Sequence, residues 1–262
     1  MTIADRYGPW ALVTGASDGI GLETARHLAA SGVNVVLAAR REPALRALAE
    51  DLERSHQVQT RVVAVDLSRP GAAAEVAEAC AGVDVGLVVL AAGFGAAGPF
   101  LESPLATATE MIGVNVTAVT VLAHVMGGRL AARGRGGIIL FGSLLGWQGV
   151  PGQATYAATK AYVQALAEGL HSELADRGVD VVSVAPGPVH TGFAARAGMT
   201  MRSATAPDVV AAGALRKLGR GVTVVPGVQG RLLTLALAPL PRRFRTAILG
   251  RVVAGMADTA SP

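Results

Sequence analysis

Ser143, Tyr156 and Lys160 are three residues whose types and spacing could move a proton. In a helix, residues i and i+4 share a face, so this spacing places the ammonium group of Lys160 beside the ring of Tyr156. A neighbouring cation favours the phenolate and lowers a tyrosine pKa from about 10 toward neutrality, where a general acid or base works best. We therefore expect Tyr156 to exchange a proton with a substrate oxygen that Ser143 holds. The alternative is an ordinary helix and loop, and Tyr-x-x-x-Lys alone does not decide between the two.

A strand, a glycine turn and a helix near the N-terminus could position a cofactor for that chemistry. Residues 10–13 read as a short buried strand, and Thr-Gly-Ala-Ser-Asp-Gly-Ile-Gly (residues 14–21) leads into an apolar-periodic stretch. Such glycines let the backbone turn tightly and approach a pyrophosphate at the positive end of the helix. The spacing differs from the commoner Gly-x-Gly-x-x-Gly motif. The predicted cofactor-binding residues of this turn are Gly15, Ser17, Asp18, Gly19, Ile20 and Gly21.

The residues after the second expected strand indicate which dinucleotide binds. A carboxylate about 20 residues beyond the glycine turn is typical of NAD binding, but here strand 33–38 is followed by Ala39, Arg40 and Arg41, with no acid before Glu42. A guanidinium group suits a phosphate better than a pair of hydroxyls. We predict NADP(H), with Arg40 at the 2′-phosphate, assisted by Ser17 and Arg41. The alternatives are a solvated arginine loop and an NAD-linked dehydrogenase that works oxidatively.

Taken together, these motifs resemble the short-chain dehydrogenase/reductase family over roughly residues 9–227. Thr14, Gly15, Gly19 and Gly21 match its glycine motif, and Asn115, Ser143, Tyr156 and Lys160 match its catalytic set. The resemblance implies that Asn115 interrupts a helix and holds a water for proton relay. It also implies that Lys160 binds the nicotinamide ribose in addition to lowering the pKa of Tyr156.

The resemblance implies further cofactor contacts at the ends of later strands. Asp66 would meet the adenine amino group, and Val189 and Thr191 would hold the nicotinamide carboxamide. Plain strand-end turns are the alternative for these segments. One departure is Ala91, where the family usually has an asparagine that ties neighbouring strands together. The remaining residues predicted to bind cofactor in this way are Leu67, Ala92, Gly93, Pro186 and Gly187.

Length and patterning predict one α/β domain. A chain of 262 residues suits a single large core, and alternating strands and helices joined by short connections favour a doubly wound Rossmann fold with helices on both faces of a parallel sheet. We expect residues 1–227 to form the dinucleotide-binding catalytic domain, with a substrate loop at about 192–206, and residues 228–262 to form a helical appendage. The seven expected strands are 10–14, 33–38, 61–65, 85–90, 137–142, 179–185 and 222–225.

The predicted function is hydride transfer between NADP(H) and the carbonyl or alcohol carbon of a hydrophobic ketone or secondary alcohol. The resemblance is strongest to 3-ketoacyl and hydroxysteroid reductases. Two other functions stay open: a non-catalytic dinucleotide-binding sensor or scaffold, and a nucleotide-sugar epimerase or dehydratase, which usually needs a longer C-terminal region. The residues expected to line the substrate pocket are Phe94, Leu144, Leu145, Trp147 and Gln153, with Phe193, Met199 and Met201 in the substrate loop.

Composition argues against several other functions. A net charge of +4 and an aromatic content of 4% disfavour a nucleic-acid surface. The histidines lack metal-ligand spacing, and the single cysteine, Cys80, reads as a buried filler. We expect neither a signal peptide nor a membrane span, and hence a cytoplasmic protein.

The C-terminal region and the expected assembly leave alternatives open. Residues 228–256 combine leucines with arginines and are broken by Pro239 and Pro241, which indicates two amphipathic helices. They could cap the substrate mouth, contact another subunit or touch an anionic membrane surface. Family resemblance implies a homodimer or homotetramer that pairs through the long helices beginning near Asn115 and Tyr156.

Overall fold

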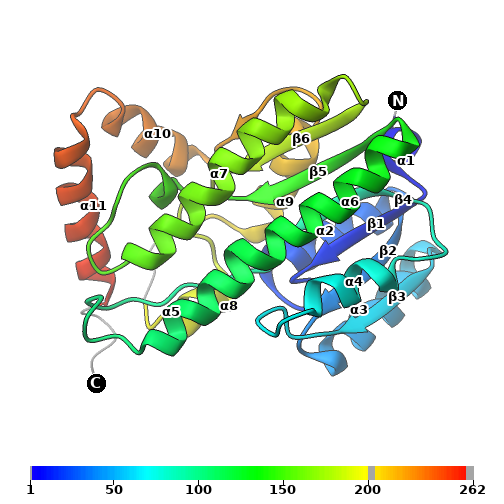
Figure 1. Ribbon diagram of the computed structural model, residues 1–262, viewed down its shortest axis with the longest axis horizontal. Helices are drawn as coiled ribbons and strands as arrows, with labels where there is room; N and C mark the ends of the chain where they lie inside the picture. The colour runs from blue at the N-terminus through cyan, green and yellow to red at the C-terminus, as the bar shows by residue number, and fades with distance from the viewer. Residues whose placement is uncertain (1, 200–203, 258–262) are drawn as a thin grey trace.

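The computed structural model describes residues 2–199 and 204–257. Its centre is a seven-stranded parallel sheet in the order β3-β2-β1-β4-β5-β6-β7 (Figure 1). The strand order reverses between β1 and β4, and ligands of doubly wound sheets bind at such a switch point, outside the carboxyl ends of the strands. The strands are β1 Trp10–Thr14, β2 Asn34–Ala39, β3 Thr60–Ala64, β4 Val85–Leu90, β5 Gly136–Phe141, β6 Val179–Val184 and β7 Thr223–Val224.

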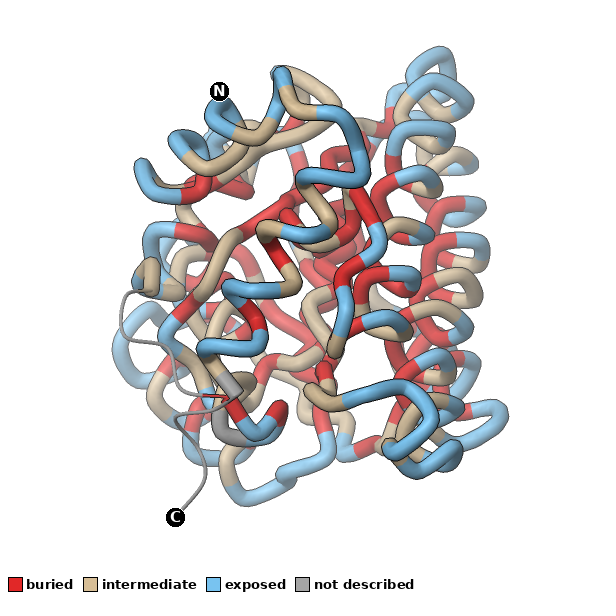
Figure 2. Tube along the Cα trace, turned by 90° about the vertical axis from the view of Figure 1, so that its left-hand side faces the viewer, coloured by how far each residue is buried: buried red, intermediate tan, exposed pale blue. Residues whose placement is uncertain are grey.

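Helices cover both faces of this sheet and bury it. One apolar cluster joins the sheet to α4, α5, α6 and α7, and a second joins it to α1, α2, α3 and α9. Strands β4 and β5 are buried along their whole length, and buried residues gather in the interior while the helices expose their outer sides (Figure 2). Sequences of such strands read as continuous apolar runs. The helices are α1 Ile3–Tyr7, α2 Gly19–Ala30, α3 Glu42–His56, α4 Ala72–Ala79, α5 Leu105–Ile112, the π-helix η1 Gly113–Ala118, α6 Val119–Arg133, the 3-10 helix η2 Leu144–Trp147, α7 Ala154–Ala175, α8 Gly192–Arg196, α9 Pro207–Lys217, α10 Val228–Leu237 and α11 Arg242–Ala257.

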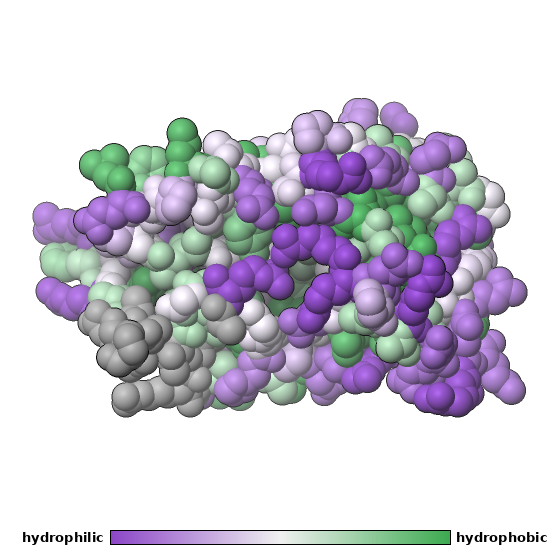
Figure 3. Space-filling view, turned by 90° about the horizontal axis from the view of Figure 1, so that it is seen from below, coloured by the Kyte–Doolittle hydropathy of each residue, from purple (hydrophilic) through white to green (hydrophobic). Residues whose placement is uncertain are grey.

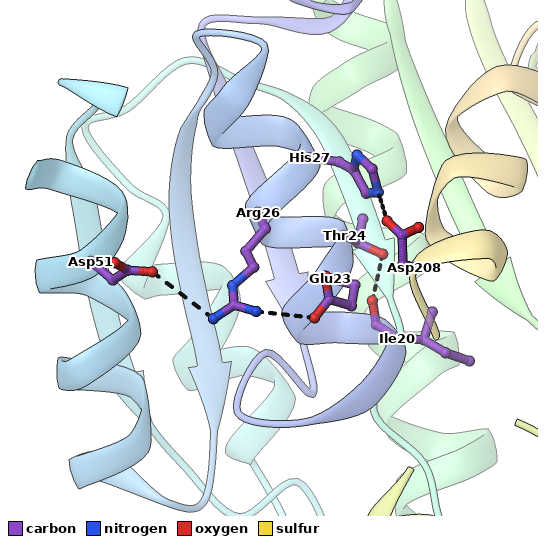
Figure 4. Close-up of polar contacts among 7 residues, drawn as sticks. All are labelled: Ile20, Glu23, Thr24, Arg26, His27, Asp51 and Asp208. Atoms are coloured by element: carbon purple, nitrogen blue, oxygen red, sulfur yellow. Dashed lines mark hydrogen bonds and ion pairs between the residues drawn. The ribbon is translucent and has the colours of Figure 1, made fainter. Parts of the chain in front are cut away.

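Helix α2, which follows the glycine turn, is held on both flanks by polar contacts. Arg26 lies between Glu23 at 3.2 Å and Asp51 of α3 at 3.9 Å, and His27 lies 2.6 Å from Asp208 of α9 (Figure 4). These partly exposed pairs each contribute little to stability. Their role is to hold α2 in position against α3 and α9. The first turn of α2 faces the region where the cofactor is expected.

Helices α5, η1 and α6 form one continuous stretch, Leu105–Arg133, in which η1 is a π-helix. By length and composition this stretch is apolar enough to cross a membrane. Half of its apolar window is nevertheless buried inside the molecule, as expected of a core helix. π-Helical turns inserted in α-helices are frequent at functional sites, and this one carries Asn115.

Helices α10 and α11 stand beyond one end of the sheet, at the left of Figure 1. Leu249 and Val253 of α11 are buried against Val150, Ala157 and Met199 in a third apolar cluster, separate from the two that flank the sheet. Helix α11 therefore covers the region where η2, α7 and the segment after α8 meet.

The predicted fold class is confirmed. All seven expected strands occur within two residues of their predicted bounds, and helices cover both faces of the sheet. Cys80 is buried, as predicted, and burial raises the pKa of its thiol to about 11. Residues 200–203 of the expected substrate loop, including Met201, lie outside the described residues.

Candidate active site

A cavity of about 310 Å³ lies at the carboxyl ends of the strands. The β1–α2 turn and the segments after β2, β3, β4, β5 and β6 line it, together with α7, α10 and α11. From below, the molecular surface is hollowed near its centre and hydrophilic side chains surround the hollow (Figure 3). The switch point of the sheet therefore opens into one continuous cavity.

The glycine turn approaches other backbone so closely that side chains are excluded. Gly15 has a φ of 69°, and an added Cβ would lie 2.9 Å from the backbone of Ala92. At Gly21, an added Cβ would clash with the carbonyl oxygen of Gly15. At these two positions the turn presents backbone without a side chain, and residues of the turn and of the first turn of α2 line the cavity. Such a cradle at a helix N-terminus fits the pyrophosphate of a dinucleotide.

Arginines and a carboxylate lie at the far end of this cradle. Arg41 donates through Nη2 to the backbone oxygen of Ser17 at 2.9 Å and to its Oγ at 3.5 Å. Arg40 lies 3.9 Å from Asp66 and 3.7 Å from Glu110. Both guanidinium groups line the cavity, so this end can bind an anion such as a phosphate.

Asp66 stays ionised at this end. Partial burial works to raise the pKa of its carboxyl group, but hydrogen bonds from Ser68 and the positive charge of Arg40 outweigh burial and lower that pKa. Ser68 donates to the carboxylate from its backbone nitrogen at 3.0 Å and from its hydroxyl at 2.8 Å. The carboxylate is therefore fixed in direction and can accept a hydrogen bond, as expected of a group that recognises an amino substituent.

Ser143, Tyr156 and Lys160 line the other end of the same cavity. Ser143 precedes η2, and its Oγ accepts from the backbone nitrogen of Leu145 at 3.2 Å. Lys160 lies one turn after Tyr156 on α7, and its Nζ is 5.8 Å from the centroid of the tyrosine ring. Tyr156 and Lys160 therefore share one face of α7, as predicted, and Ser143, the residue before η2, lines the same end of the cavity.

The predicted lowering of the Tyr156 pKa is not found. Burial raises that pKa to about 12, and the hydrogen bond with Ser143 opposes the rise only in part. The ammonium group of Lys160 donates to the carbonyl oxygen of Phe141 at 2.8 Å, and burial lowers its own pKa to about 8. Sequence spacing predicts the shared face correctly but not the loss of hydration, which dominates both pKa values.

Asn115 is fully buried in η1 and acts as a tie between elements. Its Oδ1 accepts from the backbone nitrogen of Phe94 at 3.1 Å, while its Nδ2 donates to the oxygen of Phe94 at 2.9 Å and to Oγ1 of Thr159 at 3.1 Å. Thr14 makes a second tie, since its Oγ1 accepts from the backbone nitrogen of Ala92 at 3.1 Å. These bonds secure the segment after β4, where Ala91 lacks the amide usual in the resembled family.

Most of the predicted site residues come together around the cavity, and two do not line it. Asn115 is buried behind the wall. Trp147, the last residue of η2, is not among the residues that line the cavity, so its predicted place in the substrate pocket is not found there. The predicted residues that line the cavity are Gly15, Ser17, Asp18, Gly19, Ile20, Gly21, Arg40, Arg41, Asp66, Leu67, Ala92, Gly93, Phe94, Ser143, Leu144, Leu145, Gln153, Tyr156, Lys160, Pro186, Gly187, Val189, Thr191, Phe193 and Met199.

The individual lining residues of the C-terminal helices were missed from the sequence. Both α10 and α11 are apolar at many positions, so periodicity indicated a covering element without showing which side chains reach the cavity. In α11 the signal that could have found them is the i, i+4 pair of Leu249 and Val253, which shares one helix face. The lining residues of α10 and α11 are Leu233, Leu249, Val252, Val253 and Met256.

A doubly wound sheet with a glycine cradle at its switch point, and a serine, a tyrosine and a lysine around the same cavity, defines a nicotinamide-dependent oxidoreductase. The chain belongs to the short chain dehydrogenase family, whose family model matches residues 9–201.

Three comparisons show what the chain is similar to within that family. A 7beta-hydroxysteroid dehydrogenase from Clostridium sardiniense is 36% identical over 191 residues, which are 73% of this chain and 73% of that protein. A solved 7beta-hydroxysteroid dehydrogenase structure matches with a TM-score of 0.89 and 29% identity over 95% of this chain and 100% of that one. A short-chain dehydrogenase from Sphingobium yanoikuyae, solved in complex with NADPH, matches with a TM-score of 0.81 and 32% identity over 88% of this chain and 94% of that one.

Proposed function

We propose that this protein is an NADP(H)-dependent oxidoreductase that interconverts a bulky apolar ketone and its secondary alcohol. The observation that carries the proposal is the placement of Ser143, Tyr156 and Lys160 in the same cavity as the glycine cradle. When bound, the nicotinamide supplies the hydride. The chain's own residues then have to position the carbonyl and move one proton.

The protonation state of Tyr156 is the one that reduction of a carbonyl group requires. A pKa of about 12 keeps the phenol protonated near neutral pH, so the hydroxyl can donate to a carbonyl oxygen. Ser143 supplies a second polar group at the same end of the cavity, where it can hold that oxygen. Lys160 is buried, and its ammonium group donates to the carbonyl oxygen of Phe141. This hydrogen bond ties the part of α7 that carries Tyr156 to the end of β5.

Two observations support NADP(H) over NAD(H). Arg40 and Arg41 line the cavity where a cofactor phosphate would lie, and Arg41 contacts Ser17. The relative from Sphingobium yanoikuyae was solved with NADPH. A guanidinium pair stabilises a phosphate more than a hydroxyl pair, so the 2′-phosphate is the group we expect these side chains to select.

The substrate end of the cavity is apolar. Phe94, Leu145, Phe193, Leu249 and Val253 line it, and the Phe193 ring lies with its centroid 5.4 Å from that of Tyr156. Apolar walls with few polar groups favour large hydrophobic ligands. The similarity to 7beta-hydroxysteroid dehydrogenases supports steroid ketones as the first substrates to test.

The test measures consumption of reduced cofactor with a panel of steroid, acyl and cyclic ketones. We expect turnover with NADPH to exceed turnover with NADH. Tyr156→Phe should lower kcat by about 10²- to 10⁴-fold, the usual contribution of a general acid, while NADPH binding persists. Tyr162→Phe is the matched control, because Tyr162 lies on the same helix, is exposed and bonds only Thr120 in the described part of the chain.

Two results would contradict the proposal. Binding of NADPH without turnover of any ketone would indicate a sensor or scaffold. Equal activity of Tyr156→Phe and the parent protein would exclude Tyr156 as the proton donor.

A further inference from the structure

Gln153 carries a buried polar atom that the proposed chemistry does not use. Its side chain is 2% exposed and lines the cavity, and it precedes α7, three residues before Tyr156. Among the described residues, its Oε1 has no hydrogen-bond partner. Buried polar atoms are almost always paired, so an unpaired amide oxygen at the wall of a ligand cavity needs an explanation.

The geometry decides which end of the amide is unpaired. Nε2 of Gln153 lies 3.3 Å from Sδ of Met199. A thioether sulfur carries no hydrogen and can only accept, so the amide nitrogen must face it. The free atom is therefore the oxygen, which is an acceptor and needs a donor.

The side chains around Gln153 offer few hydrogen-bond donors for that oxygen. The adjacent apolar cluster contains Val150, Ala157, Ala197, Leu249 and Val253. These side chains have no donor, and they come from the segment before α7, from α7, from α11 and from the segment after α8. A donor for Oε1 would have to enter from the cavity itself.

We infer that Gln153 is a specificity-determining residue that accepts a hydrogen bond from a hydroxyl group of the substrate, remote from the reacting carbonyl. The inference rests on the proposed function and narrows its substrate class to bulky apolar ketones that carry a second, hydroxyl-bearing position. A substrate with that hydroxyl pairs Oε1, whereas its deoxy analogue leaves Oε1 unpaired in an apolar wall. Sites built in this way discriminate strongly against the analogue that lacks the hydroxyl.

The test crosses two enzymes with two kinds of substrate. The probes are 7-oxosteroids that carry a hydroxyl group at carbon 3 or at carbon 12, each beside the analogue without it. The parent protein should prefer the hydroxyl-bearing member of at least one pair by about tenfold or more in kcat/KM. Gln153→Met, which keeps the length and apolar volume of the side chain, should abolish that preference by lowering the kcat/KM of the hydroxyl-bearing member to that of its deoxy analogue.

A control variant separates this role from the loss of any buried amide. Gln148 is 4% exposed, bonds the oxygen of Leu144 and does not line the cavity. Gln148→Met should keep the substrate preference of the parent protein. A preference lost equally in both variants would overturn the inference, as would a preference that survives in Gln153→Met.

Two readouts besides turnover decide the inference separately from the proposed function. Calorimetric binding of the same steroid pairs in the presence of NADP⁺, which has no hydride to transfer to a ketone, should show the same preference and its loss in Gln153→Met, even if no ketone is reduced. The ligand-free melting temperature of Gln153→Met should stay within about 4 °C of that of the parent protein, because Oε1 makes no hydrogen bond to the described residues that the substitution could break. A fall of more than about 4 °C, or no binding preference in the parent protein, would overturn the inference.

Discussion

Lys160 lies in an environment unlike that of a surface lysine. The sequence holds two lysines among its 23 lysine and arginine residues. The other, Lys217, ends α9 and is half-buried. Lys160 is 7% exposed, bonds Phe141 and has its pKa lowered from 10.5 to about 8 by burial. An arginine could not titrate in this range, because guanidinium groups stay charged to a pKa above 12.

The lowered pKa predicts how the stability contributed by Lys160 depends on pH. Below pH 8 both the folded and unfolded chains hold the proton, and the burial penalty is constant. Between pH 8 and 10.5 the unfolded chain binds more protons than the folded chain, so the free energy of unfolding contributed by this group rises with pH. Relative to Lys160→Met, the parent protein should gain about 3 kcal/mol between pH 7 and pH 10.5. Urea unfolding of both proteins across this range measures the difference.

The comparison with Lys160→Met removes the contributions of all other titrating groups, which the two proteins share. Lys217→Met is the control, and its curve should run parallel to that of the parent protein. Parallel curves for Lys160→Met would show that Lys160 keeps an ordinary pKa in the folded protein.

At the residue scale the sequence predicts which groups share the site but not how burial affects them. The i, i+4 spacing of Tyr156 and Lys160 and the glycine spacing depend on local geometry, which the sequence contains. The raised pKa of Tyr156 and the exclusion of Trp147 from the cavity depend on what packs around each side chain. The unpaired oxygen of Gln153 depends on Met199, which lies 46 residues away in the sequence.

At the scale of elements, α11 closes the substrate end of the cavity without belonging to the sheet. Leu249 is 2% exposed and Val253 is 4% exposed, and both line the cavity and join the cluster that contains Val150. The glycine cradle and the arginines lie on other elements. The structure therefore separates the groups that would hold the cofactor from the helix that shapes the substrate end.

Leu249→Ala should affect substrate use and stability while sparing the cofactor. Replacing a buried leucine by alanine costs about 2 to 5 kcal/mol, so the melting temperature should fall. The KM for bulky ketones should rise because the wall of the cavity recedes, whereas NADPH affinity should stay unchanged. Steady-state kinetics, thermal unfolding and cofactor titration check the three parts.

Ala254→Ser on the exposed side of α11 is the matched control and should behave like the parent protein. A loss of NADPH affinity in Leu249→Ala as large as the change in KM would show that α11 shapes the cofactor site as well.

The elements themselves could be predicted well. Parallel strands buried on both faces, such as β4 and β5, read as unbroken apolar runs, and Pro239 with Pro241 indicated the break between α10 and α11. The π-helical form of η1 and the way α11 folds back over η2 could not be predicted, because both depend on contacts between segments far apart in the chain.

At the scale of the whole molecule, we propose a homodimer that pairs through the outer side of α7. Ala161 is partly exposed, Ala165 and Gly169 are exposed, and the three residues recur every four positions on one face. Small side chains allow two helices to approach closely. In a two-fold symmetric dimer the same patch lies on both subunits. A charged residue introduced there would therefore face the same charged residue of the partner subunit, and the two would repel each other.

Ala165→Arg should therefore convert a dimer of 26.5 kDa chains into monomers without unfolding them. Light scattering coupled to size exclusion measures the mass, and circular dichroism checks the fold. Ala74→Arg, at an exposed position of α4, should leave the assembly intact. A monomeric parent protein, or a dimer that survives Ala165→Arg, would exclude this interface.

The scarcity of lysine has a practical consequence. Lys217 lies where α9 leads into β7, at the amino ends of the strands, whereas the cavity opens at their carboxyl ends. Lys160 is buried and presents little reactive surface. Amine coupling through Lys217 to a solid support would therefore hold the protein at the amino ends of the strands. The cavity would then face the liquid, with no engineered tag.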